Sequence, residues 1–202
     1  MSKLYLGLPL YQDTLDDTSY LEHANRRKAV ATITKKVCLL GDFAVGKTSL
    51  VRRFVYSIFE DRYLATIGVR VSRKVLHLPG NAANEETTLN LMLWDMAGSD
   101  VFTRVRSSYL RGASGVVLVC DLTRAETLSS LSGYIATLND LNMQTALILA
   151  ANKCDLTDQA QLSMAEIEDF IAPLAIPYYL TSAKDGTAVD AVFEHLGTLL
   201  LR

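Results

Sequence analysis

Residues Gly41-Asp42-Phe43-Ala44-Val45-Gly46-Lys47-Thr48 match the pattern G-x-x-x-x-G-K-[ST]. In this pattern the glycines let backbone N–H groups turn inward around phosphates, the lysine reaches the β- and γ-phosphates, and the hydroxyl binds Mg²⁺. Residues 35–40, just upstream, have the composition of a short buried strand, and residues 48–55, with Ser49 in the first turn, have helical spacing. A helix N-terminus would add partial positive charge to the site. We therefore predict that residues 41–49 bind the phosphates of a nucleotide.

Composition limits the class of protein. The 202 residues suffice for one domain with a short appendage, and half of them are hydrophobic, which allows a sizeable core. The net charge of −2 gives no general attraction to nucleic acid. The longest apolar run, residues 146–151, is too short to span a bilayer, and the three cysteines lack metal-ligand spacing. We expect a cytoplasmic monomer with reduced thiols and no nucleic-acid partner.

Residues 1–34 share no pattern with the rest and are predicted to be an N-terminal extension to a domain that spans 35–202. Within the extension, Ser19-Tyr20-Leu21-Glu22 is a possible capping box, with acidic residues before it and basic residues after it. The extension is therefore either a short helix that docks or binds a partner, or a solvated tail. Gly7 and Pro9 interrupt its apolar residues, which argues against a signal peptide.

The rest of the chain alternates between strand and helix patterns. Residues 67–78 alternate apolar and polar side chains, which predicts a strand with one solvated face, and residues 88–94 predict its antiparallel partner at the sheet edge. Buried strands are predicted at 115–120, 146–151 and 176–180, with helices near 125–141, 163–172 and 187–201. Such alternation indicates a parallel sheet covered on both faces. The predicted fold is an α/β P-loop domain of three layers, with a six-stranded, mostly parallel sheet and one antiparallel edge strand.

Two polar stretches indicate a metal beside the phosphate loop. Asp95-Met96-Ala97-Gly98 follows a predicted strand, where a carboxylate can hold Mg²⁺ and a glycine N–H can approach a terminal phosphate. Alone, such a carboxylate could equally cap a helix. Thr66 lies in a connecting segment, where its hydroxyl could ligate Mg²⁺ if the segment folds over the nucleotide, or could simply begin a strand.

Two further stretches point to the base. Asn152-Lys153-Cys154-Asp155 and Ser182-Ala183-Lys184 each follow a predicted strand. A carboxylate can accept hydrogen bonds from guanine N1–H and from its exocyclic amine, whereas adenine offers no such pair of donors. The lysine stems can cover the faces of the base, and the Ala183 N–H can donate to guanine O6. The sequence therefore predicts selection of guanine, chiefly by Asp155.

Taken together, these motifs resemble those of small GTPases of the Ras superfamily, closest to the Rab branch. The resemblance covers residues 35–202 and rests on residues 41–48, 66–69, 94–98, 107–113, 152–155 and 182–184. It implies a switch that binds GTP or GDP with Mg²⁺, and two mobile loops, roughly 59–69 and 96–110, that the third phosphate orders. It also places Phe59 against the guanine edge and Tyr63 over the phosphates.

The resemblance also implies protein partners. Effectors, exchange factors and activating proteins would bind through residues 59–71 and 94–110. Val71, Trp94 and Tyr109 occupy the positions of the hydrophobic partner-binding patch of Rab proteins, although Trp94 and Tyr109 could equally be half-buried core residues.

Three departures from the family pattern concern hydrolysis and membrane attachment. Ser99 stands where the family has the glutamine that orients the attacking water, and its side chain is too short to bridge water and phosphate. Phe43 stands where relatives carry Gly or Ser, in the path of an arginine finger that contributes roughly 10³ to 10⁵ in rate. The last residues, Leu199-Leu200-Leu201-Arg202, include no cysteine for prenylation, so we expect no intrinsic lipid anchor. Any recruitment to membranes would then need a protein partner.

The leading hypothesis is a slow GTPase switch. In it Lys47 and the loop N–H groups neutralise developing charge, while Thr48, Thr66 and Asp95 hold the metal. Gly98 senses the third phosphate, and Ser99 replaces the water-positioning residue. Arg104 or Arg106 would either add a catalytic charge or belong to a solvated helix face. The alternatives are a nucleotide-regulated binding module that hardly turns over and an ATP-using P-loop enzyme.

Overall fold

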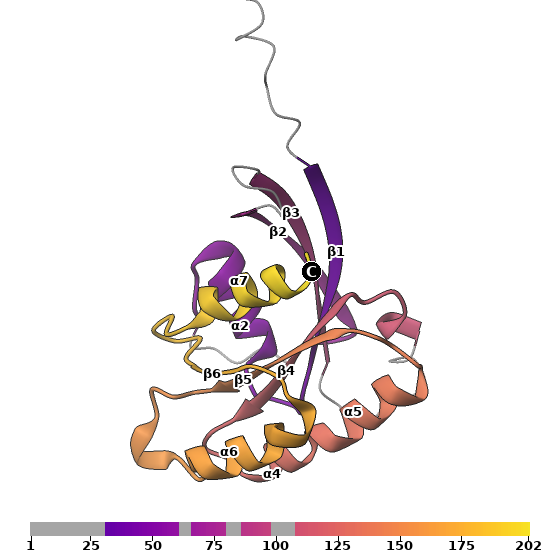
Figure 1. The fold of residues 1–202 in the computed structure, drawn as a ribbon. Helices are drawn as coiled ribbons and strands as arrows, with labels where there is room; N and C mark the ends of the chain where they lie inside the picture. The colour runs from indigo at the N-terminus through magenta and orange to yellow at the C-terminus, as the bar shows by residue number, and fades with distance from the viewer. Residues whose placement is uncertain (1–30, 61–65, 80–85, 98–107) are drawn as a thin grey trace, which may run out of the picture.

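A six-stranded sheet forms the centre of the computed structural model, which describes residues 31–60, 66–79, 86–97 and 108–202. The strand order is β2-β3-β1-β4-β5-β6, and neighbouring strands run parallel except for the antiparallel pair β2 and β3 (Figure 1). The predicted sheet, with its antiparallel edge strand, is therefore confirmed. The strands are β1 (Ala31–Leu40), β2 (Val69–Pro79), β3 (Glu86–Met96), β4 (Gly115–Asp121), β5 (Ala146–Asn152) and β6 (Tyr178–Thr181).

Helices cover both faces of the sheet, as the alternating pattern predicted (Figure 1). One face packs against α2 (Lys47–Tyr56) and α7 (Val189–Leu199). The other face packs against α4 (Glu126–Ser129), α5 (Leu131–Asp140) and α6 (Met164–Ile171). Two short 3₁₀ helices, η2 (Thr157–Gln159) and η3 (Ala172–Leu174), follow β5 and α6. Among the described residues, no helix is long and apolar enough to cross a bilayer.

The core between the sheet and the pair α2 and α7 holds the helix that begins at the phosphate loop. Phe54 of α2 stacks on Phe193 of α7 with ring centroids 4.2 Å apart, and both side chains are buried. Gly197 lets α7 lie close to the sheet, because a Cβ there would come within 3.0 Å of Leu78 and 3.2 Å of Leu89. Apolar packing of this kind fixes where α2 begins and so where the loop before it lies.

The strand β1 begins at Ala31, earlier than the predicted strand 35–40. It pairs with β3 from Ala31 onward but with β4 only from Val37, so β1, β2 and β3 extend beyond the other strands (Figure 1). Thr32-Ile33-Thr34 supplies β-branched residues that suit a strand, and Ile33 packs against the core. The first strand therefore includes part of the predicted N-terminal extension. The possible capping box at Ser19 lies outside the described residues.

The helix predicted near 125–141 is divided into α4 and α5. The hydroxyls of Ser129 and Ser130 each donate to the carbonyl of Glu126 at 2.9 Å. Such side-chain bonds to the preceding turn bend helices slightly, while Ser130 itself keeps right-handed helical dihedral angles, so the chain passes from α4 into α5 with only a local irregularity.

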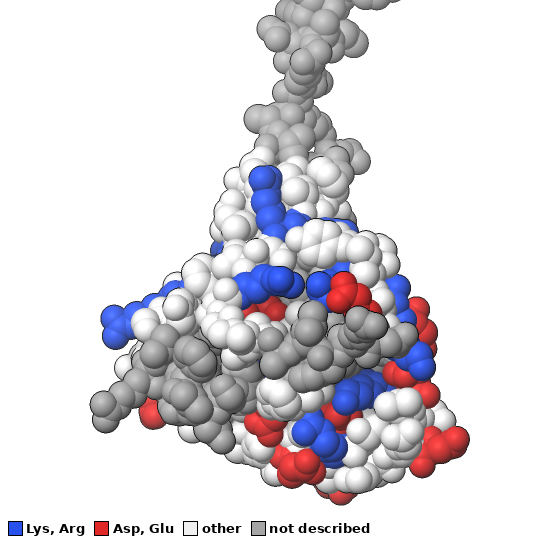
Figure 2. Space-filling view, turned by 180° about the vertical axis from the view of Figure 1, so that it is seen from behind, with Lys and Arg blue, Asp and Glu red and all other residues white. Residues whose placement is uncertain are grey.

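Basic and acidic side chains are unevenly distributed over the surface. On the face shown in Figure 2, Lys and Arg predominate on the upper half, while Asp and Glu lie in the middle and lower parts among other basic groups.

Cys38 and Cys120 are buried free thiols, and burial raises their pKa to about 11 and about 12. Both thiols therefore stay protonated and inert near neutral pH.

Candidate functional site

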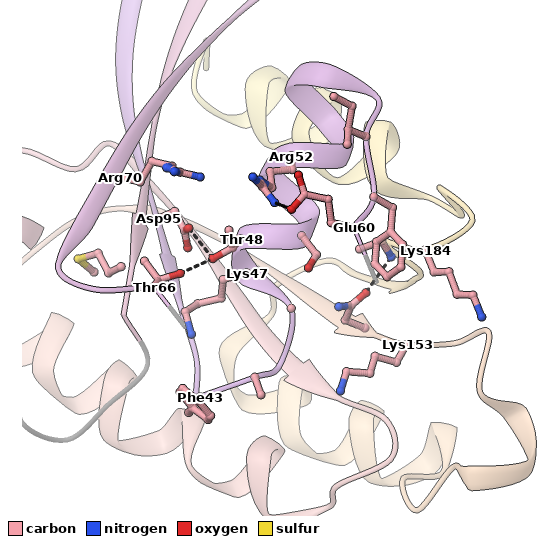
Figure 3. Close-up of a pocket in the computed structure, with 18 of the residues that line it drawn as sticks. Phe43, Lys47, Thr48, Arg52, Glu60, Thr66, Arg70, Asp95, Lys153 and Lys184 are labelled. Atoms are coloured by element: carbon pink, nitrogen blue, oxygen red, sulfur yellow. Dashed lines mark hydrogen bonds and ion pairs between the residues drawn. The ribbon is translucent and has the colours of Figure 1, made fainter. Parts of the chain in front are cut away.

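A cavity of about 640 Å³ lies at the carboxyl ends of the central strands, where parallel α/β sheets bind ligands (Figure 3). The segments that the sequence singled out meet there, although they lie far apart along the chain. Most of the predicted site residues line this cavity, namely Phe43, Ala44, Gly46, Lys47, Thr48, Ser49, Phe59, Thr66, Asp95, Asn152, Lys153, Asp155, Ala183 and Lys184. Four other described residues of the prediction are not part of the lining: Gly41, Asp42, Val45 and Ser182.

The phosphate loop depends on two glycines. Gly41 has φ 149°, and a Cβ there would lie 2.1 Å from the carbonyl oxygen of Val119. Gly46 has φ 103°, and a Cβ would lie 2.1 Å from Nδ2 of Asn152. Both positions therefore exclude any side chain. Lys47 is buried, and its Nζ donates to the carbonyls of Gly41 and Asp42 at 2.8 and 2.7 Å, which holds the ammonium group across the loop.

Three oxygen-bearing side chains converge at one end of the cavity. The Oγ1 atoms of Thr48 and Thr66 lie 2.6 Å apart, and Thr48 donates to Oδ2 of Asp95 at 2.6 Å. Asp95 is only 1% exposed, and its Oδ1 is buried without a hydrogen-bond partner among the described residues. Burial raises the pKa of Asp95, and the hydrogen bond from Thr48 offsets this only in part.

This arrangement fits a magnesium ion. Mg²⁺ prefers oxygen ligands and usually takes only one or two carboxylates, with phosphates and water completing its shell. A buried carboxylate oxygen that lacks a partner is a group that such an ion would satisfy. Thr66, which on local sequence could have been an ordinary residue at the start of a strand, lies against Thr48 as the metal hypothesis requires.

The other end of the cavity is fixed by Asn152. Its Nδ2 donates to the carbonyl of Val45 at 2.9 Å, while its Oδ1 accepts from the Ala183 N–H at 3.2 Å. One side chain thus joins the phosphate loop to both predicted base-binding loops. Asp155 Oδ1 accepts from the Ser182 hydroxyl at 2.7 Å, and Oδ2 has no hydrogen bond to the described residues. Asp155 therefore keeps acceptor capacity toward the cavity.

Comparison with known proteins agrees with this geometry. Residues 36–202 match the family model described as Ras family. The chain belongs to the Ras family. It is 30% identical over 182 residues to Ras-related protein Rab-1C of Dictyostelium discoideum, which covers 90% of this chain and 87% of that protein. It is also 34% identical over 159 residues to Ras-related protein RABD2c of Arabidopsis thaliana, which covers 78% of this chain and 76% of that protein.

Membership of the Ras family, with Rab-like relatives, makes this chain a small GTPase that binds GTP and acts as a switch. The family also implies that GDP binds, that Mg²⁺ accompanies the nucleotide, and that effectors, exchange factors and activating proteins interact with the protein. The Ras-family motifs coincide with the cavity described above.

Three groups beside the Ras-family motifs were not predicted. The first is Arg53 of α2, whose Nε donates to the carbonyl of Ala183 at 2.9 Å and whose Nη2 donates to the carbonyl of Lys184. This arginine fastens the second base-binding loop to the helix that begins with Lys47. The motif search passed over it because its partners are backbone atoms, which leave no side-chain pattern in the sequence.

The second group is centred on Asp121, the last residue of β4. Its side chain is fully buried, and Oδ2 accepts from Lys153 Nζ at 2.6 Å and from Arg124 Nε at 3.0 Å. Arg124 Nη2 also donates to the carbonyl of Phe43 at 2.8 Å. Burial disfavours the charged carboxylate, but hydrogen bonds from Lys153 and Thr123 hold the pKa of Asp121 below its usual value. Its position at the end of a buried strand is the signal that could have revealed it.

The third group lies at the metal end of the cavity. Arg52 of α2 forms an ion pair with Glu60 at 2.6 Å, and Arg70 of β2 also lines the cavity. Neither arginine belongs to the motifs from which the site was predicted.

Five of the predicted residues lie outside the described part of the chain: Tyr63, Gly98, Ser99, Arg104 and Arg106.

The predicted hydrophobic partner-binding patch lies within the described residues. Val71 is directly opposite Trp94, and the Trp94 and Tyr109 rings lie 6.2 Å apart. Val71 is 44% exposed and Tyr109 is 36% exposed, while Trp94 is half-buried with Lys36 Nζ 4.0 Å from its ring centroid. The three side chains form one continuous surface.

Proposed function

We propose that the cavity binds GTP or GDP together with Mg²⁺ and that the protein hydrolyses GTP slowly. The observation that supports this most strongly is the meeting, in one cavity, of a metal-type oxygen cluster with the base-binding loops. Thr48, Thr66 and Asp95 lie at one end, and Asn152 and Asp155 lie at the other. The phosphate loop connects the two ends.

Each side chain then has a definite role. Lys47 and the loop N–H groups would neutralise the charge that develops on the phosphates. When bound, Mg²⁺ supplies Lewis-acid stabilisation of the phosphate oxygens, and Thr48, Thr66 and Asp95 would hold it directly or through water. Asp155 would accept from guanine N1–H and the exocyclic amine, Ala183 N–H would donate to O6, and the stems of Lys153 and Lys184 would flank the base. Phe59 would touch the guanine edge, and Tyr63 would lie over the phosphates.

Slow turnover is argued from the residues beside the third phosphate. Ser99 replaces the glutamine that orients the attacking water in relatives, and the shorter side chain lacks the amide for that task. Phe43 is 47% exposed at the phosphate loop, where its ring would obstruct an arginine finger. In this proposal Gly98 still reports the presence of the third phosphate through its N–H group.

An alternative follows from the same two substitutions. If Ser99 and Phe43 stop hydrolysis almost completely, the protein remains bound to GTP and changes state mainly by nucleotide exchange. It would then act as an interaction module whose GTP-bound lifetime is set by exchange factors.

Single-turnover hydrolysis of Mg·GTP by the wild type, Ser99→Gln and Phe43→Gly separates these possibilities. We expect the wild type to hydrolyse below the roughly 10⁻⁴ per second of an unassisted relative, with a rise of at least tenfold in Ser99→Gln. Phe43→Gly should respond more to an added arginine-finger protein than the wild type does. A wild-type rate at or above that of an unassisted relative would contradict the proposal and would direct attention to Arg104 and Arg106.

Partner binding is proposed at residues 59–71 and 94–110, with the Val71, Trp94 and Tyr109 surface as the apolar contact for an effector, an exchange factor or an activating protein. The support is that this surface adjoins the metal end of the cavity through β2 and β3. We further propose that residues 35–202 act as the GTPase domain, with 1–34 as an extension, and that the protein is a cytoplasmic monomer that a protein partner can recruit to membranes.

A further inference from the structure

Arg70 lies directly across from the central carboxylate of the metal end. In the antiparallel pairing of β2 with β3, Arg70 is opposite Asp95, and both residues line the cavity. Directly opposed residues have Cβ atoms roughly 5 Å apart and side chains on the same face of the sheet. Figure 3 shows Arg70, Arg52 and Asp95 around the same part of the cavity, next to Thr48. A guanidinium group therefore lies on the same face of the sheet as the carboxylate that would hold a metal, at the same end of the cavity.

The other cations near Asp95 already have partners. Lys47 donates to two loop carbonyls, and Arg52 is paired with Glu60 at 2.6 Å. Within the described ranges, the Arg70 side chain forms no ion pair or hydrogen bond, and Asp95 Oδ1 is buried without a hydrogen-bond partner. Arg70 and Asp95 are thus complementary groups on neighbouring strands that act on each other without direct contact, and the charge of Arg70 lowers the pKa of the carboxyl.

We propose that Arg70 competes with Mg²⁺ for the carboxylate of Asp95, so that it weakens metal binding and speeds spontaneous nucleotide exchange. Two effects act in the same direction. The charge of Arg70 repels an incoming Mg²⁺, and when the metal has left, the same charge compensates the buried carboxylate. The inference rests on the proposed function, because it concerns the metal that accompanies the nucleotide.

The neighbouring strand residues supply a matched control. Arg73 lies on the opposite face of β2, where its Nη2 donates to Asn90 Oδ1 at 2.8 Å. Arg73→Gln removes the same charge from the same strand without altering the metal end. Arg70→Lys keeps the charge, whereas Arg70→Gln removes it and keeps a polar side chain. Arg70→Leu is a second neutral variant, should the glutamine disturb folding.

The test is the release of fluorescent methylanthraniloyl-GDP from the full chain, chased with excess GDP over a series of buffered free Mg²⁺ concentrations. The quantity measured is the free Mg²⁺ concentration at which release is half slowed. We expect this midpoint to fall about tenfold in Arg70→Gln and Arg70→Leu, which corresponds to one charge acting on a divalent ion roughly 6 Å away through water-like screening. It should stay near the wild-type value in Arg70→Lys and Arg73→Gln, and release without Mg²⁺ should not become slower in any variant.

An unchanged midpoint in both neutral variants would overturn the role of Arg70, and so would an equal shift in Arg73→Gln. A midpoint that rises in the neutral variants would overturn it as well, since Arg70 would then support the metal. Failure of every protein, including the wild type, to bind the fluorescent nucleotide would instead refute the proposed function. The two failures are therefore distinguishable.

Discussion

Two buried aspartates at the same edge of the sheet have opposite pKa shifts, because burial outweighs the stabilising contacts of Asp95 and does not outweigh those of Asp121. Asp95 receives one hydroxyl and leaves Oδ1 unpaired, so burial dominates and raises its pKa. Asp121 is equally hidden from solvent but receives an ammonium and a guanidinium group, and these bonds lower its pKa. The two carboxylates thus differ in how completely their oxygens are hydrogen-bonded within the protein, as expected if Asp95 holds a ligand and Asp121 holds the structure together.

Replacement of Asp121 by Asn should destabilise the protein in a pH-dependent way. The pKa of Asp121 is lower in the folded state than its ordinary value of 3.8, so its ionised form stabilises the fold at all pH values above 3.8. That contribution is lost as pH falls through the folded-state pKa. At pH 7 we expect a loss of about 1–3 kcal/mol in the free energy of unfolding, because two partly exposed cations lose their acceptor.

Urea unfolding of the wild type and Asp121→Asn at neutral pH and at several acid pH values measures this difference. The exposed Asp158→Asn is a suitable control, because Asp158 lies in η2 away from this network. A difference between the wild type and Asp121→Asn that stays constant below pH 3.8 would show that the carboxylate charge is not the source of the stability.

At the scale of elements, the position of the cavity depends on α2 packing against α7. Phe54→Ala removes a ring stacked 4.2 Å from Phe193 in the core, and we expect it to lower the free energy of unfolding by about 3–5 kcal/mol. Tyr56→Ala, on the same helix at a residue that is 57% exposed, should change it by less than about 0.5 kcal/mol. Chemical denaturation monitored by circular dichroism compares the two, and similar losses would contradict the packing described here.

Local patterns predicted most elements and motifs, because apolar periodicity and the phosphate loop are properties of neighbouring residues. The sheet with its antiparallel edge pair and many of the residues that line the cavity were obtained in this way, whereas Arg52 and Arg70, which also line it, were not. Two signals that were present went unused: Thr32-Ile33-Thr34, which extends β1, and the capping box in which Ser163 and Glu166 exchange hydrogen bonds at the start of α6.

Other features could not be predicted because they arise only when distant segments meet. Arg53 contacts carbonyls 130 and 131 residues away, and Arg124 contacts a carbonyl 81 residues away. The pairing of Arg70 with Asp95 depends on the register between β2 and β3, and alternation alone does not fix it, because a slip by two residues leaves every side chain on the same face. Side chains that bind backbone atoms or cross-strand neighbours therefore escape a search for motifs.

At the scale of the whole molecule, the first residues of β1 should contribute measurably to stability. A chain that lacks residues 1–30 keeps the whole of β1, which begins at Ala31, and is the reference for a chain that lacks residues 1–34. Removal of residues 1–34 should cost about 1–3 kcal/mol more than removal of residues 1–30, since it also deletes the pairs with Thr87 to Asn90 and the packing of Ile33. Thermal unfolding of the two truncated proteins and the full chain measures this, and equal stability of the two truncations would contradict the structure of the strand.

The side chain of Asn152, which joins three loops, also bears on the order in which the parts of a nucleotide would leave the cavity. At the predicted base end, Asn152, Arg53 and Asp155 make hydrogen bonds within the protein that need no ligand to form. At the other end, the contact among Thr48, Thr66 and Asp95 spans three separate segments. We expect a departing nucleotide to free its phosphates first and its base last. The intermediate would remain attached by guanine alone, close enough to return before a competing nucleotide arrives.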